Sequence, residues 1–194
     1  MSQFPEEPLS DAGSGYFPAS PSQTLKNGHY KVIRKLGWGP RSSVWLATYP
    51  VEYAAPSRPC KLLITRTCTS GIVMEYCVIK ILTVHATDEH RGLSPEIKAL
   101  QAVYDQAGYK RLPCLHDNFF ESSDHGKHLC IVFLDILPDI DTTLRLTAPD
   151  KYLRVHIVKK IIASITEPLQ YLHQAGFFHG GEQCWLNFTQ HTVY

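Results

Sequence analysis

Three features, met in order along the chain, have the chemistry to hold a nucleotide phosphate group. The first is a glycine turn, Gly37-Trp38-Gly39, between two apolar runs. The second is Lys80 at the end of another apolar run, and the third is Glu96 at the start of a helical pattern. Glycines let backbone N–H groups approach phosphate oxygens closely, and a lysine held by a carboxylate adds positive charge beside them. This ordered set therefore indicates a phosphate-binding site.

Each feature also has a simpler interpretation when it is taken alone. Two glycines between strands are typical of an ordinary β-hairpin. A lysine on an edge strand can lie along the surface with its ammonium group in water. A buried, unpaired ammonium is costly, so we expect Lys80 to need Glu96 as its partner. The occurrence of all three features in this order favours the phosphate site.

Apolar residues near the turn predict a cover for a purine base. Leu36 and Val44 stand on either side of the glycines. A later apolar run would place Phe133 at the rear of the pocket, and backbone groups of Leu134 and Ile136 would face the edge of the base. A plain buried strand is the alternative interpretation of that run.

Hydrophobic periodicity predicts the elements that position these residues. Strands are expected over residues 30–36, 44–49, 74–82, 114–121 and 129–134, the last two forming a hairpin. A helix should begin at Ser94-Pro95-Glu96, because serine is a good N-cap and proline fits the first turn, and it should run to about Gln106. A second helix over about 154–175 carries an apolar stripe, which Pro168 should kink or weaken.

Composition predicts a globular intracellular protein. Hydrophobic residues make up 44% of the chain, and 19 Lys and Arg nearly balance 18 Asp and Glu, so charge suggests neither nucleic acid nor a membrane as partner. The start of the chain lacks the pattern of a secretory signal, and the six cysteines form no CxxC pair. We therefore expect reduced cysteines and a cytoplasmic or nuclear location. His125 and His128 are expected to be exposed in a turn rather than to bind a metal.

Residues 30–46, with the Gly-Tyr-Phe-Pro patch at 15–18, resemble the SR-protein kinases, which are serine/threonine kinases of arginine-serine-rich splicing factors. The family's typical loop reads Gly-Trp-Gly-x-x-Ser-x-Val-Trp-Leu, and the segment from Gly37 to Leu46 matches it. Residues 128–133 and 153–173 resemble the strand before the hinge and the helix before the catalytic loop. The resemblance covers residues 15–49 and 74–181.

The resemblance implies an α+β kinase small lobe, a twisted antiparallel sheet with one helix, over residues 29–137. An extended or disordered leader (1–28), whose Gly-Tyr-Phe-Pro patch could dock on the domain, would precede it. An irregular insertion (50–73) would interrupt it, and a partial large lobe (138–181) and an aberrant tail (182–194) would follow. It implies ATP as ligand and Ser/Arg-rich proteins as substrates. Lys80 would bind phosphates and Glu96 would orient it. The remaining nucleotide contacts would come from Leu36, Gly37, Trp38, Gly39, Ser42, Val44, Val78, Phe133, Leu134 and Ile136.

Departures from the family's catalytic loop predict a loss of activity. In His179-Gly180-Gly181, the position of the catalytic Asp holds Gly181, and Leu186 stands at the metal-binding Asn position, with Asn187 one residue late. The sequence also contains no Asp-Phe-Gly. Because these residues supply the general base and the Mg²⁺ ligands, we expect Mg²⁺ binding and phosphoryl transfer to be impaired.

Two alternatives to a nucleotide-binding kinase segment remain. The chain is a non-catalytic pseudokinase module that docks partners or a second copy of itself through an exposed helix at 154–175. If no other surface packs against the apolar stripe of this helix, about 10 kcal/mol of stabilisation from hydrophobic burial is lost. Or the chain is a non-functional fragment whose insertion and tail are translated non-coding sequence.

Overall fold

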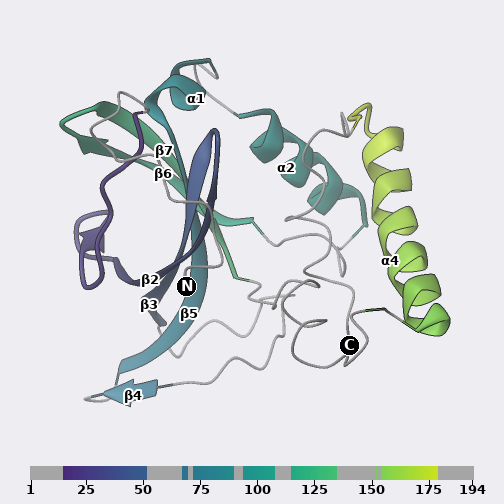
Figure 1. Ribbon diagram of the computed structural model, residues 1–194, viewed down its shortest axis with the longest axis horizontal. Helices are drawn as coiled ribbons and strands as arrows, with labels where there is room; N and C mark the ends of the chain where they lie inside the picture. Colours follow the sequence, from purple (N-terminus) through teal and green to yellow (C-terminus); the bar gives the residue numbers. More distant parts are fainter. Residues whose placement is uncertain are drawn as a thin grey trace. The chain divides into compact units, whose positions relative to one another are not determined.

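The computed structural model describes residues 15–51, 67–69, 72–89, 94–107, 115–134, 152 and 154–178 (Figure 1). The chain divides into two units, residues 1–95 with 115–134, and residues 96–114 with 135–194. The strands all belong to the first unit, and the helices α2 and α4 belong almost entirely to the second.

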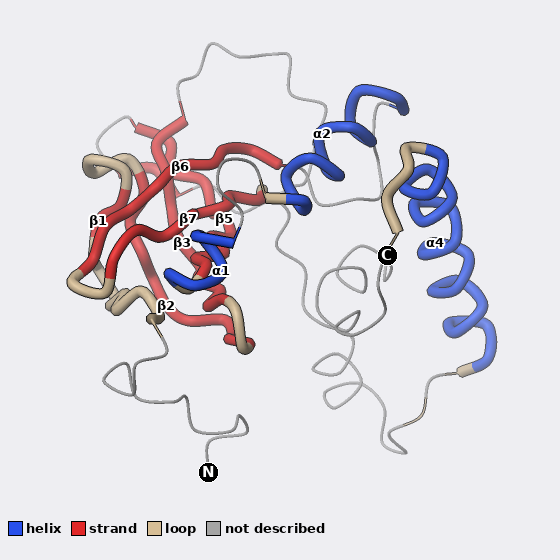
Figure 2. The backbone as a smooth tube through the Cα atoms, turned by 90° about the horizontal axis from the view of Figure 1, so that it is seen from above, coloured by secondary structure: helices blue, strands red, loops and turns tan. Residues whose placement is uncertain are grey.

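An antiparallel sheet forms the first unit, drawn in red in Figure 2. Its strand order is β1-β2-β3-β5-β7-β6, with β4 paired to β5 beside this path. The strands are β1 (Thr24–Leu25), β2 (Tyr30–Gly39), β3 (Ser42–Val51), β4 (Thr67–Thr69), β5 (Ile72–Leu82), β6 (Leu115–Ser123) and β7 (Gly126–Phe133). The predicted antiparallel sheet and the predicted hairpin at its edge are both confirmed.

Side chains alternate between the two faces of the sheet along each strand, and one of these faces packs in the main core. In β3 every second residue is buried, from Ser43 to Tyr49, as expected for a strand with one face packed. This core face of the sheet is made by Tyr30, Val32, Trp45, Ala47, Tyr49, Cys77, Ile79, Ile81, Cys130 and Val132. Cys77 and Cys130 are buried free thiols, as predicted for reduced core cysteines.

The prediction of a disordered leader over residues 1–28 is wrong from Gly15 onward. Tyr16 and Phe17 are each only 5% exposed, and Leu25 of β1 is 1% exposed. The backbone is held as well, because β1 pairs with β2 and Ser22 donates its N–H to the Val32 carbonyl oxygen. A few apolar side chains in a segment rich in Pro, Ser and Gly are enough to anchor it. Residues 1–14 lie outside the described residues.

The predicted irregular insertion at 50–73 is regular at both ends. Pro50 pairs with Met74 and Val51 with Val73, so β3 and β5 extend further than their hydrophobic runs suggest. Residues 67–69 add the short strand β4. Residues 52–66 and 70–71 lie outside the described residues.

A short helix, α1 (Val84–Glu89), follows β5 in a stretch for which the sequence analysis predicts no element. Thr83 caps its start, since its hydroxyl accepts the N–H of Ala86 at 3.2 Å. Thr87 ties the helix to β7 by accepting the N–H of Leu129 at 3.0 Å. Six residues are too few for a visible hydrophobic period, which is why the helix escaped prediction.

His128 is buried, contrary to the prediction of two exposed histidines, whereas His125 is exposed as predicted. The Nδ1 atom of His128 lies 2.9 Å from the Leu82 carbonyl oxygen and must donate to it, so Nε2, 2.8 Å from the Ser123 hydroxyl, is free to accept. The ring also packs edge-on against Phe17. Burial lowers the pKa of His128, and the imidazole is held neutral.

This buried imidazole predicts a loss of stability in mild acid. Below about pH 6.5 the unfolded chain takes up a proton at His128 that the folded chain resists, so the free energy of unfolding falls as the pH drops toward the lowered folded pKa. Urea unfolding at pH 7.5 and pH 5.5 should show this decline, and His128→Gln should flatten it. The exposed control His125→Gln should keep it. An equal pH dependence in all three proteins would contradict the assignment.

A polar cluster ties the turn after β1 to β6. The Asp117 carboxylate accepts from the Tyr30 hydroxyl at 2.7 Å and from the Lys26 ammonium at 2.5 Å. Burial alone would raise the pKa of Asp117, but the hydrogen bonds from Lys26 and Tyr30 outweigh it and hold that pKa below its ordinary value. The Tyr30 ring stacks on Phe119 in the core.

The second unit contains α2 (Pro95–Ala107) and α4 (Val155–Gln174), both close to their predicted bounds. Leu172 near the end of α4 is buried, and Ala99 of α2 packs against it together with Leu169 and Phe177. The two helices are therefore joined by apolar contact, and α2 covers one end of the α4 stripe.

The rest of the α4 stripe is unevenly covered. Ile161 is 9% exposed, whereas Val158 and Ile162 are 37% and 58% exposed. The helix runs through Pro168 as one element, and that proline is buried. No helix in the described part of the chain is long and apolar enough to cross a membrane.

Candidate nucleotide-binding site

The glycine turn predicted from the sequence is the end of the β2–β3 hairpin. Gly37 pairs with Val44 and Gly39 with Ser42, which leaves Pro40 and Arg41 as the turn. A register shift between Lys35 and Gly37 gives β2 an extra residue at Leu36, which is half-buried. Such a bulge increases the local twist of the strand.

Neither glycine of this hairpin is required by its own fold. Gly37 and Gly39 do not have the positive φ that favours glycine, and a Cβ atom built on either meets no protein atom within 4 Å. The space beside both backbones is open. An approach by something outside the described chain, such as a phosphate group, is a physical reason for glycine at these positions.

The strand registers bring most of the predicted site residues onto one face of the sheet. Val44 pairs with Lys80, and Lys80 with Ile131, which makes one row across β3, β5 and β7. Leu46, Val78 and Phe133 make the next row. Side chains directly opposite one another share a face, and neighbours in a strand alternate. These rows therefore lie opposite the core face that contains Trp45, Ile79 and Val132, and we call them the ligand face.

Lys80 is the only charged side chain among the six residues of these rows in β3, β5 and β7; the exposed Arg34 of β2 pairs with Leu46 at the end of the second row. Lys80 is half-buried and stands in β5 between Ile79 and Ile81, which are 0% and 1% exposed. Well-packed neighbours in the central strand fix the backbone from which the lysine projects. The pairing partners of Gly37 and Gly39, Val44 and Ser42, point to this same face of the sheet. The ligand face thus combines open glycine backbones, one ammonium group and an apolar floor.

Comparison with known proteins finds similarity to protein kinases, although no family model matches the chain. Protein kinase dsk1 of Schizosaccharomyces pombe is 29% identical over 171 residues, which is 85% of this chain and 27% of that kinase. Serine/threonine-protein kinase SKY1 of Saccharomyces cerevisiae is 28% identical over 90% of this chain and 22% of its own length. SRSF protein kinase 3 of Mus musculus is 29% identical over 87% of this chain and 26% of its own length.

The chain is similar in sequence to SR-protein kinases. It spans about a quarter of the length of these curated relatives. Solved kinase domains share the fold. The Mycobacterium tuberculosis PknI kinase domain is 21% identical with a TM-score of 0.50, and the match covers 84% of this chain and 55% of that one. Another kinase domain, 18% identical, gives a TM-score of 0.56 over 82% of this chain and 39% of its own. The predicted fold, a kinase small lobe with part of a large lobe, is confirmed.

The side chain of Trp38 lies on a different face of the sheet from the other predicted nucleotide contacts in β2 and β3. It pairs with Ser43 and so lies on the core side of the hairpin, away from Val44 and Lys80. Its indole packs edge-on against Tyr16, with ring centroids 6.4 Å apart. Strand alternation turns its side chain to the opposite face, so the membership of Trp38 in the nucleotide site stays a prediction for its backbone. Only its backbone belongs to the loop.

The structure describes two of four further predicted site residues, Glu96 and Leu134. Glu96 is the second residue of α2, is half-buried and belongs to the second unit, so its ion pair with Lys80 stays a prediction. Leu134 directly follows β7 and is half-buried. Ile136 and Gly181 lie outside the described residues. For Tyr16, the sequence predicts docking of the Gly-Tyr-Phe-Pro patch on the domain but not its contact with the β2–β3 hairpin.

Replacing Gly39 by alanine is expected to separate folding from ligand binding. Because a Cβ at Gly39 meets nothing and φ is unrestricted, the free energy of unfolding should stay the same or rise by about 0.4–1 kcal/mol. The added methyl should nevertheless weaken ATP binding by about tenfold or more, since it occupies the space that a phosphate would enter. Urea unfolding and an ATP titration measure the two effects.

The matched control for this substitution is Gly126→Ala in the β6–β7 turn. Gly126 has φ +134°, and its Cβ would lie 3.2 Å from Val84, so alanine there should destabilise the chain. Affinity of the remaining folded protein for ATP should not change. If Gly39→Ala binds ATP as tightly as the unmodified chain, the phosphates do not approach this turn.

Proposed function

We propose that the chain is the ATP-binding part of a serine/threonine protein kinase of the SR-protein kinase type. The observation that carries this proposal is the ligand face, where Val44, Lys80 and Ile131 form one row and Leu46, Val78 and Phe133 the next. Open glycine backbones lie at the end of the same hairpin. The kinship with SR-protein kinases supports ATP as the nucleotide.

Each part of the ligand face has a chemical task in this proposal. The N–H groups around Gly37 and Gly39, with the Ser42 hydroxyl, receive the phosphates. The Lys80 ammonium neutralises charge on the α and β phosphates, and the Glu96 carboxylate orients it. The base lies against the apolar side chains and meets backbone groups of the segment after β7. These base contacts are Leu36, Val44, Val78, Phe133, Leu134 and Ile136.

Phosphoryl transfer to Ser/Arg-rich proteins is the activity that kinship suggests for a whole kinase of this type. We propose that this chain binds ATP but is catalytically defective. Gly181 stands where a carboxylate would take the proton of the substrate hydroxyl, and the metal-binding residues of the family are missing from their positions. Binding through Lys80 and the glycine hairpin needs neither of these groups, so ATP affinity can outlast activity.

Nucleotide-dependent stabilisation tests the binding proposal. A ligand that binds only the folded state raises the free energy of unfolding by about 2.7 kcal/mol at 100 times its dissociation constant. We expect ATP to raise the melting temperature of the 194-residue chain, and GTP or inorganic phosphate to do so less. A folded chain whose melting temperature does not respond to millimolar ATP, with or without Mg²⁺, would overturn the proposal.

A non-catalytic interaction module is the second candidate function, and one observation favours it. Val155, Val158 and Ile162 of α4 are 70%, 37% and 58% exposed at helical spacing. Such an apolar strip is suited to a second copy of the chain. Sedimentation velocity should then show a concentration-dependent dimer that Ile162→Glu removes. A monomer at all concentrations would exclude self-association through this strip.

A further inference from the structure

A short segment before the sheet is fixed at both of its ends. We call residues 15–17 the N-terminal strap. Its Gly15 carbonyl oxygen accepts the N–H of Val84 at 2.9 Å. At the other end, Phe17 is buried in the main core and packs edge-on against His128. A hydrogen bond to the start of α1 and an anchor in the core therefore hold the residue between them.

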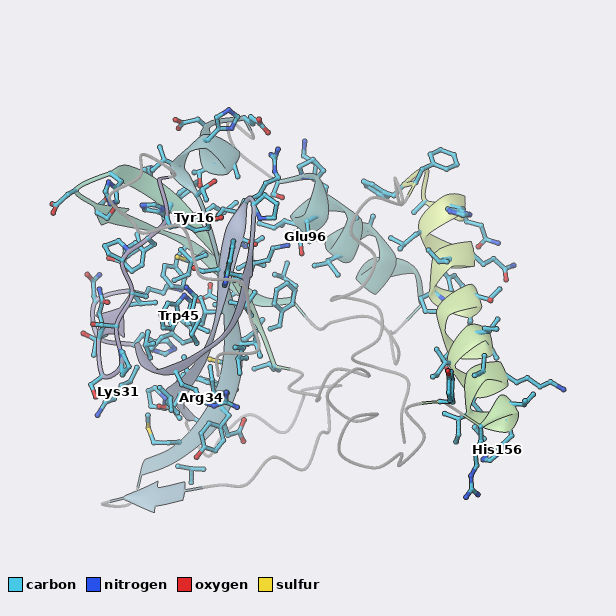
Figure 3. All side chains as sticks on the ribbon, in the orientation of Figure 1. Tyr16, Lys31, Arg34, Trp45, Glu96 and His156 are labelled. Carbon is cyan, nitrogen blue, oxygen red and sulfur yellow. The ribbon has the colours of Figure 1, made fainter. Side chains whose placement is uncertain are left out.

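That residue, Tyr16, contacts the glycine hairpin in two ways (Figure 3). Its hydroxyl donates to the Gly39 carbonyl oxygen at 2.7 Å. Its ring meets the Trp38 indole at 89°, with centroids 6.4 Å apart. Tyr16 is only 5% exposed, and Trp38 and Gly39 are half-buried, so both contacts are partly shielded from water. The Tyr16 side chain thus contacts both the backbone of Gly39 and the side chain of Trp38 in the same hairpin.

The Gly39 carbonyl, which accepts the Tyr16 hydroxyl, belongs to a peptide unit with few other restraints. The next residue is Pro40, which has no N–H, so this carbonyl oxygen is the only hydrogen-bonding group of the peptide unit that joins the two residues. Glycine itself restricts the backbone least of all residues. The hydroxyl of Tyr16 therefore adds a side-chain restraint to a peptide that no Cβ restricts.

The other side of the turn is held by the segment that follows β5. The Arg41 carbonyl oxygen accepts the N–H of Thr83 at 2.9 Å, and the Arg41 guanidinium forms an ion pair with Glu89 of α1. Both side chains of that ion pair are exposed, so it contributes little to stability. The buried contacts of Tyr16 are the stronger restraint on the hairpin.

We propose that Tyr16 is a positioning residue for the phosphate-binding loop, so that the N-terminal strap sets the nucleotide affinity of the chain. This inference rests on the proposed ATP site. A loop ordered before the ligand arrives loses less conformational entropy on binding, which increases affinity. Tyr16 reaches the loop from the Trp38 side, opposite the ligand face, so it does not contact the nucleotide.

Tyr16→Phe tests the proposal, because it removes the hydroxyl and keeps the ring. We expect amide hydrogens of a peptide covering residues 37–43 to exchange about three to ten times faster, and ATP to bind about three to ten times more weakly. Trp38→Leu, which keeps the hydroxyl and removes the ring contact, should shift both measurements in the same direction. Both experiments use the full 194-residue chain.

Tyr30→Phe is the matched control. The Tyr30 hydroxyl also donates a 2.7 Å hydrogen bond, to Asp117, but from the far end of β2, about 30 Å along the strand from Gly39. We expect it to lower global stability to a similar extent without changing exchange at 37–43 or ATP affinity, because turn amides exchange through local opening.

The two measurements distinguish the strap from the nucleotide site. If Tyr16→Phe and Tyr30→Phe show the same rate of hydrogen exchange at residues 37–43 and the same affinity for ATP, the strap has no positioning role. The proposal is then overturned. If exchange accelerates but ATP affinity is unchanged, the proposal is overturned while the ATP site stands. If the unmodified chain binds no ATP, the proposed function fails, and faster exchange in Tyr16→Phe alone still supports the hold of the strap on the hairpin.

Discussion

Replacing Lys80 by alanine is expected to remove most of the stabilisation that ATP gives the chain while leaving the fold intact. Lys80 is half-buried on the ligand face, between Val44 and Ile131 in the neighbouring strands. Hydrogen bonds to charged groups contribute about 1.5–3 kcal/mol, which corresponds to about 10–100-fold in affinity. At an ATP concentration 100 times the original dissociation constant, a 100-fold loss would reduce the stabilisation from about 2.7 to about 0.4 kcal/mol.

Lys127→Ala is the control for this loss of positive charge. Lys127 is exposed at the start of β7 and its ammonium lies over the Phe120 ring, 4.2 Å from the centroid. Both substitutions change the net charge equally, so only an effect specific to the ligand face separates them. Isothermal titration with ATP and thermal unfolding without it measure affinity and stability independently. Equal affinities in the two variants would show that Lys80 does not meet the phosphates.

The second large effect concerns phosphoryl transfer. We expect the 194-residue chain to transfer no measurable phosphate from Mg-ATP to an arginine-serine repeat peptide under conditions in which an active SR-protein kinase does. A positioned general base contributes roughly 10²–10⁴-fold, and Gly181 has no side chain to act as one. With Leu186 at the predicted metal-binding position, we also expect weaker binding of the cation that would neutralise charge on the transferred phosphoryl group.

Gly181→Asp is the informative variant in this assay. It restores one carboxylate but no Asp-Phe-Gly, so we expect it to remain inactive. Transfer by the unmodified chain that is lost in Lys80→Ala would contradict the prediction and would mean that another group, such as Glu182 next in the sequence, takes the proton. Transfer that persists in Lys80→Ala would indicate a contaminating kinase.

The sheet and the two long helices were predictable because their hydrophobic patterns extend over many residues. Alternating burial in β3 and the nearly continuous apolar run of β5 carry the same information in sequence and in structure. The ligand face needed more than pattern, since only the register places Val44 opposite Lys80 and Val78 opposite Phe133. Motif similarity grouped Trp38 with the glycines, whereas strand alternation puts its side chain on the other face.

Predictions failed where a few tertiary contacts outweigh local composition. The segment around Tyr16 and Phe17 is rich in residues typical of disorder, yet two aromatic side chains find buried places. His128 lies beside a polar turn in sequence, but its ring nitrogens find Ser123 and the Leu82 carbonyl group within the fold. Amino-acid composition describes a whole segment and cannot single out one buried side chain within it. The residues that bury these side chains are distant in the sequence, or do not recur at a helical or strand period.

Val84 lies where three backbone segments converge. A Cβ on Gly15 would come within 3.4 Å of the Val84 side chain, and a Cβ on Gly126 within 3.2 Å. Positions 15, 84 and 126 thus share one small volume, and a Cβ at 126 or a larger side chain at 84 requires the neighbouring residue to shift. In the evolution of such chains, substitutions at these three sites should be accepted only in compensating combinations, so the identity of residue 84 limits which sequences can connect the chain's beginning to its sheet.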